Sequence, residues 1–309
     1  MKNKEYKMKN GKLKEGKTDN LLYYIIYIVM RGHAILPLRV LYLFSDMLYP
    51  VVYYLVRYRR KLVRKNLENA FPSRSSEEII RLEKDFYRNF CDYWFETIKL
   101  LHMSDREIRR RMKFKNIEQV NRMMQSGNSG LMYLGHFGNW EWVPSIALWT
   151  DPSITLAQIY RPLRNRVFNR LFLRIRSRFG TFGISKDDTL REIVKMRRDH
   201  KKTLIGFMSD QTPSSRNIHY WSYFLNQDAA IFTGVERIAK QTGFYVFYLD
   251  IVRVKRGYYE AECILVEEHP AATPEFDITE RYIRMMEKTI LRNPAFWLWS
   301  HNRWKYKRV

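Results

Sequence analysis

The spacing of apolar residues divides the chain into an apolar N-terminal segment and a longer part in which helical and strand patterns alternate. Residues 21–56 carry only three charges, Arg31, Arg39 and Asp46, and none of their uncharged runs reaches the roughly 18 residues of a plain membrane-spanning helix. Basic clusters flank this segment on both sides, as expected when both ends stay on the cytoplasmic side of a membrane. We expect a basic tail over residues 1–20, a membrane-associated helical anchor over 21–56 and one folded domain over 57–309.

The pattern of residues 21–56 favours an anchor that lies in the membrane surface or re-enters it. A true single span and a helical hairpin buried in a soluble protein remain open alternatives. A cleaved signal peptide fits poorly, because no small-residue cleavage site follows the apolar stretch from Leu21 to Met30.

The rest of the chain reads as an α/β protein, since short apolar runs alternate with stretches of helical spacing. Ser75 and Glu78 have the spacing of a capping box at the start of one such helix. Helices are expected over residues 75–101, 105–112, 117–125, 163–179, 188–198, 233–241 and 278–291. Strands are expected over residues 130–135, 154–160, 203–208, 244–254 and 258–266. The last two strands, joined by a short turn at Gly257, predict a hairpin and therefore a mixed central sheet flanked by helices.

Charge is the unusual feature of the composition. Among 309 residues, 55 Lys and Arg face 32 Asp and Glu, so the formal net charge is +23. Such an excess needs an anionic partner: nucleic acid, an anionic membrane surface or a phosphorylated substrate. We find no helix-turn-helix, RNA-recognition or zinc-finger signature and expect no nucleic acid. The two cysteines, Cys91 and Cys263, have no metal-ligand spacing.

The most informative stretch for chemistry is residues 130–142, where an apolar strand runs into Gly135 and His136 and an acid, Glu141, follows five residues later. A carboxylate on one imidazole nitrogen would make the other nitrogen a general base for a hydroxyl or an amine. The alternative is a helix-initiating turn in which the histidine is merely hydrogen-bonded and the acid favours the helix dipole. The sequence contains no nucleophile elbow, phosphate loop, dinucleotide fingerprint or zinc helix, so direct transfer to an acceptor is favoured.

Several motifs in order resemble the bacterial lipid A biosynthesis acyltransferases of the lauroyl/myristoyl type, within the wider H-x4-D/E glycerolipid acyltransferase group. The motifs are RKNLxxAFP at residues 64–72, GHFGNWE at 135–141, YRPLxN at 160–165, DQ at 210–211, TG at 233–234 and NPxFWLWxHxRWK at 293–305. The likeness covers residues from about 60 to the end. The phosphate-binding Phe-Pro-Glu-Gly string of ordinary glycerol-phosphate acyltransferases is absent, which favours the lipid A branch.

This resemblance implies a glycerolipid-acyltransferase-like fold and makes residues 57–309 an acyltransferase domain. It implies transfer of a fatty acyl chain from acyl carrier protein, or alternatively acyl-CoA, to a hydroxyl of a lipid A precursor or a similar anionic glycolipid. We expect no metal and no bound cofactor, because the acyl thioester is a co-substrate. The expected location is the bacterial inner membrane, with the catalytic domain facing the cytoplasm.

The resemblance also assigns the candidate site residues. His136 and Glu141 would be catalytic, and Arg161, Asn139, Asp210 and Arg164 would bind substrate. Arg161 would clamp a phosphate or stabilise the oxyanion, although a surface role is the plain alternative. The alternatives are structural: Asn139 would only satisfy its turn, and Asp210 would only cap the turn that follows it.

A row of arginines on the helix expected over residues 163–179 belongs with these candidates. At steps of four they form a stripe that favours acidic headgroups or an acidic carrier protein, with a solvated face as the alternative: Arg166, Arg170, Arg174 and Arg178.

Two other functions remain open at the level of sequence. A lysophospholipid or aminolipid acyltransferase would keep the same histidine and acid and differ only in the acceptor pocket. A non-enzymatic basic membrane-binding protein would account for the charge and the aromatic residues alone.

Overall fold

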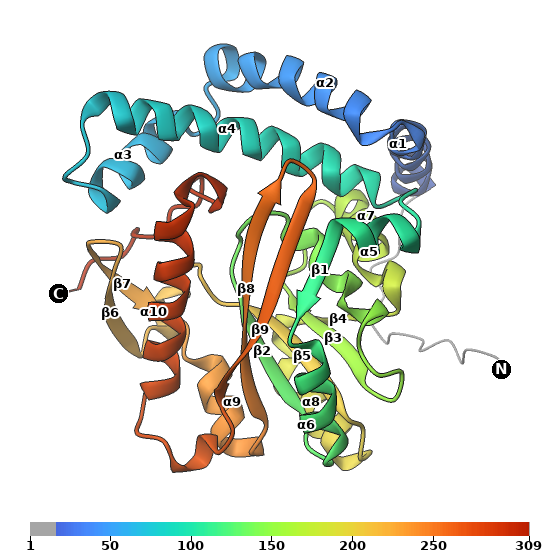
Figure 1. Ribbon diagram of the computed structural model, residues 1–309, viewed down its shortest axis with the longest axis vertical. Coiled ribbons are helices and arrows are strands. Elements are labelled where there is room, and N and C mark those ends of the chain that lie inside the picture. The colour runs from blue at the N-terminus through green and yellow to red at the C-terminus, as the bar shows by residue number, and fades with distance from the viewer. Residues whose placement is uncertain (1–16, 309) are drawn as a thin grey trace.

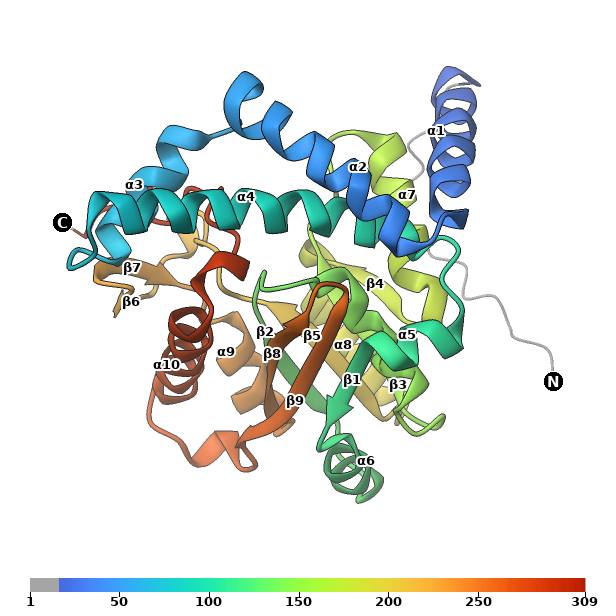
Figure 2. The ribbon, with the colours of Figure 1, turned by 45° about the horizontal axis from the view of Figure 1, so that its top comes forward.

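The computed structural model describes residues 17–308, and its first four helices form one group (Figures 1 and 2). They are α1 (Lys17–Ile35), α2 (Leu38–Pro50), α3 (Arg60–Ala70) and α4 (Ser76–Lys99), with a π-helical segment, Val51–Val56, after α2. Pro37 separates α1 from α2, because a proline disfavours helical geometry in the residue before it. The capping box that starts α4 is confirmed: Glu78 N–H donates to Ser75 Oγ, and Ser75 N–H donates to Glu78 Oε2 at 2.8 Å.

A seven-stranded mixed sheet forms the centre of the molecule, in the order β1-β9-β8-β2-β5-β3-β4. Its strands are β1 (Met112–Lys115), β2 (Gly130–Leu134), β3 (Thr155–Tyr160), β4 (Phe182–Ser185), β5 (Thr203–Met208), β8 (Tyr245–Lys255) and β9 (Tyr258–Glu267). Neighbours are parallel except β8 and β9, which form the predicted hairpin through Gly257 at a φ of 72°. The mixed α/β sheet is therefore confirmed.

The remaining helices pack on the two faces and the ends of the sheet (Figure 1). They are α5 (Asp105–Arg111), α6 (Ile117–Gln125), α7 (Arg166–Arg176), α8 (Thr189–Arg198), α9 (Gly234–Thr242) and α10 (Asp277–Arg292). A separate antiparallel hairpin consists of β6 (Tyr220–Phe224) and β7 (Gln227–Ile231). Helices α2 and α4 lie across the edge at which β2, β5 and β8 end, so the carboxyl ends of these strands face α4.

The sequence pattern missed the short elements. Strands β1, β4, β6 and β7 have four or five residues each, too few to show a period of two clearly. Helix α7 begins at Arg166 rather than Leu163, because the Asn165 side chain accepts a hydrogen bond from Phe168 N–H and caps the helix there.

The N-terminal segment has two unlike faces. Tyr23, Leu41 and Tyr53 are at most 2% exposed and belong to the main hydrophobic core, whereas the opposite side is open, with Ile28 66% and Leu55 76% exposed. No single helix among residues 17–308 is long and apolar enough to cross a membrane. The pair 18–35 and 38–56, bent by 116°, meets those criteria only when taken together. Of the predicted basic tail, residues 1–16 lie outside the described part, and residues 17–20 form the start of α1.

Candidate active site

His136 and Asp210 meet at the carboxyl edge of the sheet. Strand β2 pairs with β5 in parallel register, Leu134 opposite Met208, so both strands end at the same edge and deliver the two residues side by side. Asp210 Oδ1 lies 2.7 Å from His136 Nδ1, and Asp210 Oδ2 accepts hydrogen bonds from the backbone N–H of His136 at 2.9 Å and from Trp297 Nε1 at 2.8 Å. Three donors therefore hold one buried carboxylate in place.

The C-terminal segment brings Trp297 to this position. Phe137 and Trp297 form an isolated antiparallel β-bridge, in which Leu298 N–H donates to the carbonyl of His136 and Gly138 N–H donates to the carbonyl of Phe296. The NPxFWLWxHxRWK motif lies in one of these segments and GHFGNWE in the other, and their spacing in the sequence does not show that they pair. The bridge carries the indole of Trp297 over Asp210.

Asp210 remains ionised at neutral pH. Burial by itself raises the pKa of this carboxyl, but the charge and hydrogen bonds of His136 and the indole of Trp297 outweigh burial and bring the pKa to about 2. An ionised carboxylate only accepts hydrogen bonds, so Nδ1 of His136 carries the proton and Nε2 is the basic nitrogen. Nε2 lies 3.1 Å from the side-chain amide of Gln211, and the imidazole side chain is 18% exposed.

Glu141 does not hold the imidazole, and the predicted contact between Glu141 and His136 is wrong. The Glu141 carboxylate accepts two hydrogen bonds from Arg176, at 2.7 Å from Nε and 2.5 Å from Nη2, and one from the Tyr93 hydroxyl at 3.3 Å. No hydrogen bond joins it to His136 in residues 17–308. The reason is local: residues 140–148 wind as a 3-10 helix directly after the loop, and Glu141 is 2% exposed between α4 and α7. A buried carboxylate needs a charged partner, and α7 supplies one.

Asn139 is buried rather than open to a ligand. Its side chain is 0% exposed and donates to Glu96 Oε2 at 2.9 Å. Glu96 also accepts from the hydroxyls of Tyr259, at 2.8 Å, and Tyr42, at 2.7 Å, so one carboxylate on α4 joins the His136 loop, β9 and α2. Burial raises the pKa of Glu96. In this structure Asn139 thus holds the loop and contacts no open surface.

Arg161 and Arg164 lie apart from this group. Both are exposed, in the segment between β3 and α7, and the structure does not bring either into the hydrogen-bonded group around His136.

Three arginines of the predicted stripe contact other parts of the chain. Arg170 and Arg174 lie over the rings of Tyr23 and Tyr27 on α1, at 4.0 and 4.4 Å from the ring centres, and Arg178 donates to backbone carbonyls at the end of α4. Arg170 and Arg174 thus help to pack α7 against α1. Arg166 and Arg174 remain exposed, and binding of acidic headgroups or a carrier protein by the stripe stays a prediction.

Two residues of the C-terminal motif, His301 and Arg303, lie near Asp210. Neither was among the predicted site residues. Arg303 is 1% exposed, and none of its three guanidinium nitrogens has a hydrogen-bond partner among the described residues. Burial lowers the pKa of Arg303 to about 10, against the opposing charge of Asp210. Burial likewise lowers the pKa of His301 to about 4, so His301 is neutral near pH 7. Only tertiary structure could have identified these two side chains as neighbours of Asp210.

A histidine that an ionised carboxylate holds by one ring nitrogen, at the carboxyl edge of a mixed α/β sheet, is typical of an enzyme that takes a proton from a substrate nucleophile. Comparison with known families is more specific. Residues 8–306 match the bacterial lipid A biosynthesis acyltransferases, and the chain belongs to this family.

Individual relatives carry the same description. The chain is 25% identical over 285 residues to the lipid A biosynthesis palmitoleoyltransferase of Escherichia coli (strain K12), which covers 88% of this chain and 90% of that protein. It is 25% identical over 289 residues to the lipid A biosynthesis lauroyltransferase of the same strain, covering 87% and 90%. A lipid A biosynthesis acyltransferase of Haemophilus influenzae is 24% identical over 250 residues, covering 80% and 78%. The chain is thus an acyltransferase of the lipid A type.

Proposed function

We propose that this protein transfers a fatty acyl chain from a thioester to a hydroxyl group of a lipid A precursor or a similar anionic glycolipid, with His136 as general base. The observation that carries the proposal is the 2.7 Å contact between His136 Nδ1 and Asp210 Oδ1. That contact sets the tautomer and makes Nε2 the proton-accepting nitrogen, once the acceptor hydroxyl takes the place of the Gln211 amide beside it.

The chemistry follows from this geometry. His136 Nε2 takes the proton of the acceptor hydroxyl while the oxygen attacks the thioester carbonyl. The tetrahedral intermediate then collapses, the carbon–sulfur bond breaks, and the imidazolium returns the proton to the leaving thiolate. Asp210 stabilises the imidazolium in between, which is the role that the sequence analysis gave to Glu141. Glu141 supports the site indirectly. It binds Arg176 and so fixes the segment after His136 against α7.

The acyl donor and the binding of the acceptor lipid are separate parts of the proposal. Acyl carrier protein is the proposed donor, with acyl-CoA as the alternative, and neither route needs a metal or a bound cofactor. Arg161 and Arg164 are proposed to meet phosphate groups of the acceptor, since both are exposed where the chain leaves β3.

The proposed location is the bacterial inner membrane, with the catalytic edge of the sheet on the cytoplasmic side. The exposed apolar face of α1, α2 and the π-helical segment would lie in the membrane surface, and basic side chains around it would attract anionic lipid.

Mass spectrometry of lipid A tests the proposal. Deletion of the gene should remove one acyl increment, and the wild-type gene should restore it. The His136→Ala variant, at equal abundance in the membrane, should not restore it, and in vitro its turnover should fall about 100-fold or more because the general base is gone. Unchanged lipid A with altered phospholipids or aminolipids would contradict the proposed acceptor, and full turnover by folded His136→Ala would contradict the mechanism.

A further inference from the structure

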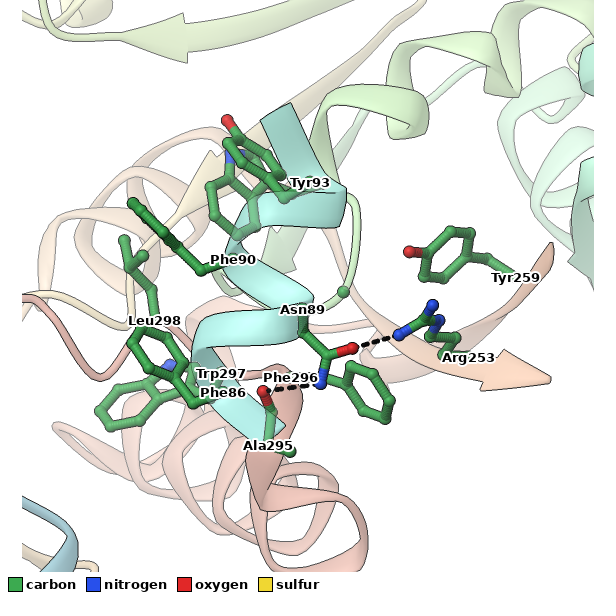
Figure 3. A pocket seen from close by; sticks show the side chains of 12 residues that line it. Phe86, Asn89, Phe90, Tyr93, Arg253, Tyr259, Ala295, Phe296, Trp297 and Leu298 are labelled. Carbon is green, nitrogen blue, oxygen red and sulfur yellow. Dashed lines mark hydrogen bonds between the residues drawn. The ribbon is translucent and has the colours of Figure 1, made fainter. Parts of the chain in front are cut away.

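A chain of aromatic rings in contact leads from the end of the N-terminal segment along α4. The ring centre of Tyr58 lies 5.7 Å from that of Phe90, Phe90 lies 6.2 Å from Trp94, and Trp94 lies 5.6 Å from Tyr93. Figure 3 shows Phe90 and Tyr93 on the same side of α4 as Leu298 of the C-terminal segment. Asn89, which bonds to Arg253, lies on the other side of this helix.

The same chain of rings ends at the catalytic histidine. Tyr93 stacks on Trp140 with ring centres 4.2 Å apart, and Trp140 meets the imidazole of His136 edge to face at 5.2 Å. We call the five rings of Tyr58, Phe90, Trp94, Tyr93 and Trp140 the aromatic row.

The aromatic row is partly open to the surface. Tyr58 is 40% and Trp94 38% exposed, and Phe90 and Trp140 are half-buried. Of the five rings only Tyr93, between Trp94 and Trp140, is buried. Large rings that meet solvent side by side form an apolar strip, and such a strip on a soluble domain usually marks a binding surface.

The row is continuous with the exposed apolar face of the N-terminal segment. Tyr58 comes two residues after the π-helical segment, whose last residues, Leu55 and Val56, are 76% and 65% exposed. One end of the row therefore adjoins the face proposed to lie in the membrane, and the other end touches His136.

We propose that the aromatic row binds an acyl chain of the membrane-resident acceptor lipid and leads the acceptor from the bilayer surface to His136. The proposal rests on the function proposed above. Moving an acyl chain from the bilayer into water costs about 0.8 kcal/mol per methylene, and a strip of rings that starts at the bilayer removes most of that cost. The row serves the acceptor rather than the donor, because it begins at the membrane face, whereas a thioester on a soluble carrier or on CoA arrives from the aqueous side.

Trp94 is the best position for a kinetic test, because it is exposed and its ring is in the middle of the row. In vesicles of phosphatidylethanolamine and phosphatidylglycerol that contain the lipid A precursor, Trp94→Ser should raise the acceptor KM roughly 10-fold and leave the donor KM unchanged. Trp94→Phe should restore most of the loss. The matched control is Tyr223→Ser, a 58% exposed ring on β6, which should change neither constant. A higher donor KM with a constant acceptor KM, or no change in either, would overturn the proposal.

A second measurement does not depend on turnover. A photoreactive benzophenone amino acid at position 94, introduced into the His136→Ala variant, should cross-link to lipid in the same vesicles, and the same group at position 223 should not. Equal labelling at both positions would overturn the aromatic row as a lipid site. If the wild-type protein transfers no acyl group to the precursor, the proposed function fails on its own, and cross-linking at position 94 still decides whether the row binds lipid.

Discussion

At the scale of single residues, two carboxylates compete for the role of partner to His136, and the contacts separate them. Asp210 receives three hydrogen bonds, two of them from His136 itself, whereas Glu141 is bound by Arg176 and Tyr93. Both acids are buried, so burial alone does not distinguish them. The distinction lies in which charged group meets each carboxylate.

Replacement of Asp210 by asparagine should lower kcat about 100-fold or more, with little change in the KM of either substrate. An amide cannot compensate the charge of the imidazolium, and it can present its NH2 group to Nδ1 and so reverse the tautomer. Steady-state kinetics of Asp210→Asn beside Glu141→Gln measures this. A larger kcat loss in Glu141→Gln would return Glu141 to the role of direct partner.

The low pKa of Asp210 also determines how its contribution to folding stability changes with pH. The folded pKa of about 2 lies below the ordinary value of 3.8. The stabilising contribution of this carboxylate is therefore fully present above the ordinary value and is lost as the pH falls through about 2. At neutral pH the wild-type protein has this contribution and Asp210→Asn lacks it.

The pair of Glu141 and Arg176 should behave as a buried ion pair. Glu141→Gln leaves a guanidinium without its counter-charge and should reduce the free energy of unfolding by about 3 kcal/mol. The double variant Glu141→Gln/Arg176→Met should recover part of that loss, because no uncompensated charge remains. Urea denaturation of the two single variants and the double variant tests the coupling. Strictly additive losses would contradict the pairing.

At the scale of elements, helix α4 joins the N-terminal helices to the loop that carries His136. Glu96, buried in α4, receives hydrogen bonds from Tyr42 on α2 and from Asn139 in the loop that carries His136. Ser45 of α2 donates to Asp92, one turn earlier on α4, at 2.7 Å. Helix α2 is thus part of the support of the site, even though its outer face is apolar and exposed.

Tyr42→Phe should lower the free energy of unfolding by about 1–3 kcal/mol. The change removes one of the donors to a buried carboxylate but keeps the ring. Thermal or urea unfolding measures the loss, and Tyr24→Phe, on a 51% exposed ring of α1, is the control that should leave stability unchanged. Equal stability of the Tyr42→Phe variant and the wild-type protein would show that Glu96 does not depend on α2.

At the scale of the whole molecule, the N-terminal segment cannot be removed as a detachable anchor. Tyr23, Leu41 and Tyr53 lie in the core, so a truncation of residues 1–56 would expose apolar surface on α4 and α7 and confuse membrane release with misfolding. Substitutions on the exposed side of the segment test membrane binding without disturbing the core.

Ile28→Ser combined with Leu55→Ser should weaken binding to anionic vesicles at least 10-fold. Both side chains are more than 60% exposed, and burial of each in lipid is worth about 1.5–3 kcal/mol. The residual binding should disappear at 1 M salt, where basic side chains no longer attract anionic lipid over useful distances. Vesicle co-sedimentation measures both effects, with Leu190→Ser on α8 as control. Undiminished binding of the double variant would place the membrane contact elsewhere.

The sequence by itself determined the elements whose pattern is local. The short apolar runs of β2, β5, β8 and β9, the turn at Gly257 and the capping box of α4 depend on neighbours within a few residues, and they were predicted with nearly the right bounds. Motif order was enough to indicate the family.

Tertiary structure alone decided the partners. Asp210 lies 74 positions from His136 in the chain and reaches it because β2 and β5 are parallel neighbours, whereas the acid five positions from the histidine turns to Arg176. Arg170 and Arg174 are a second example. Their spacing predicts a stripe on one helix face, but only the packing of α1 shows that they contact tyrosine rings. Local periodicity tells which face of an element is apolar, but the pairing of charges depends on strand order and helix packing, which no short window of sequence contains.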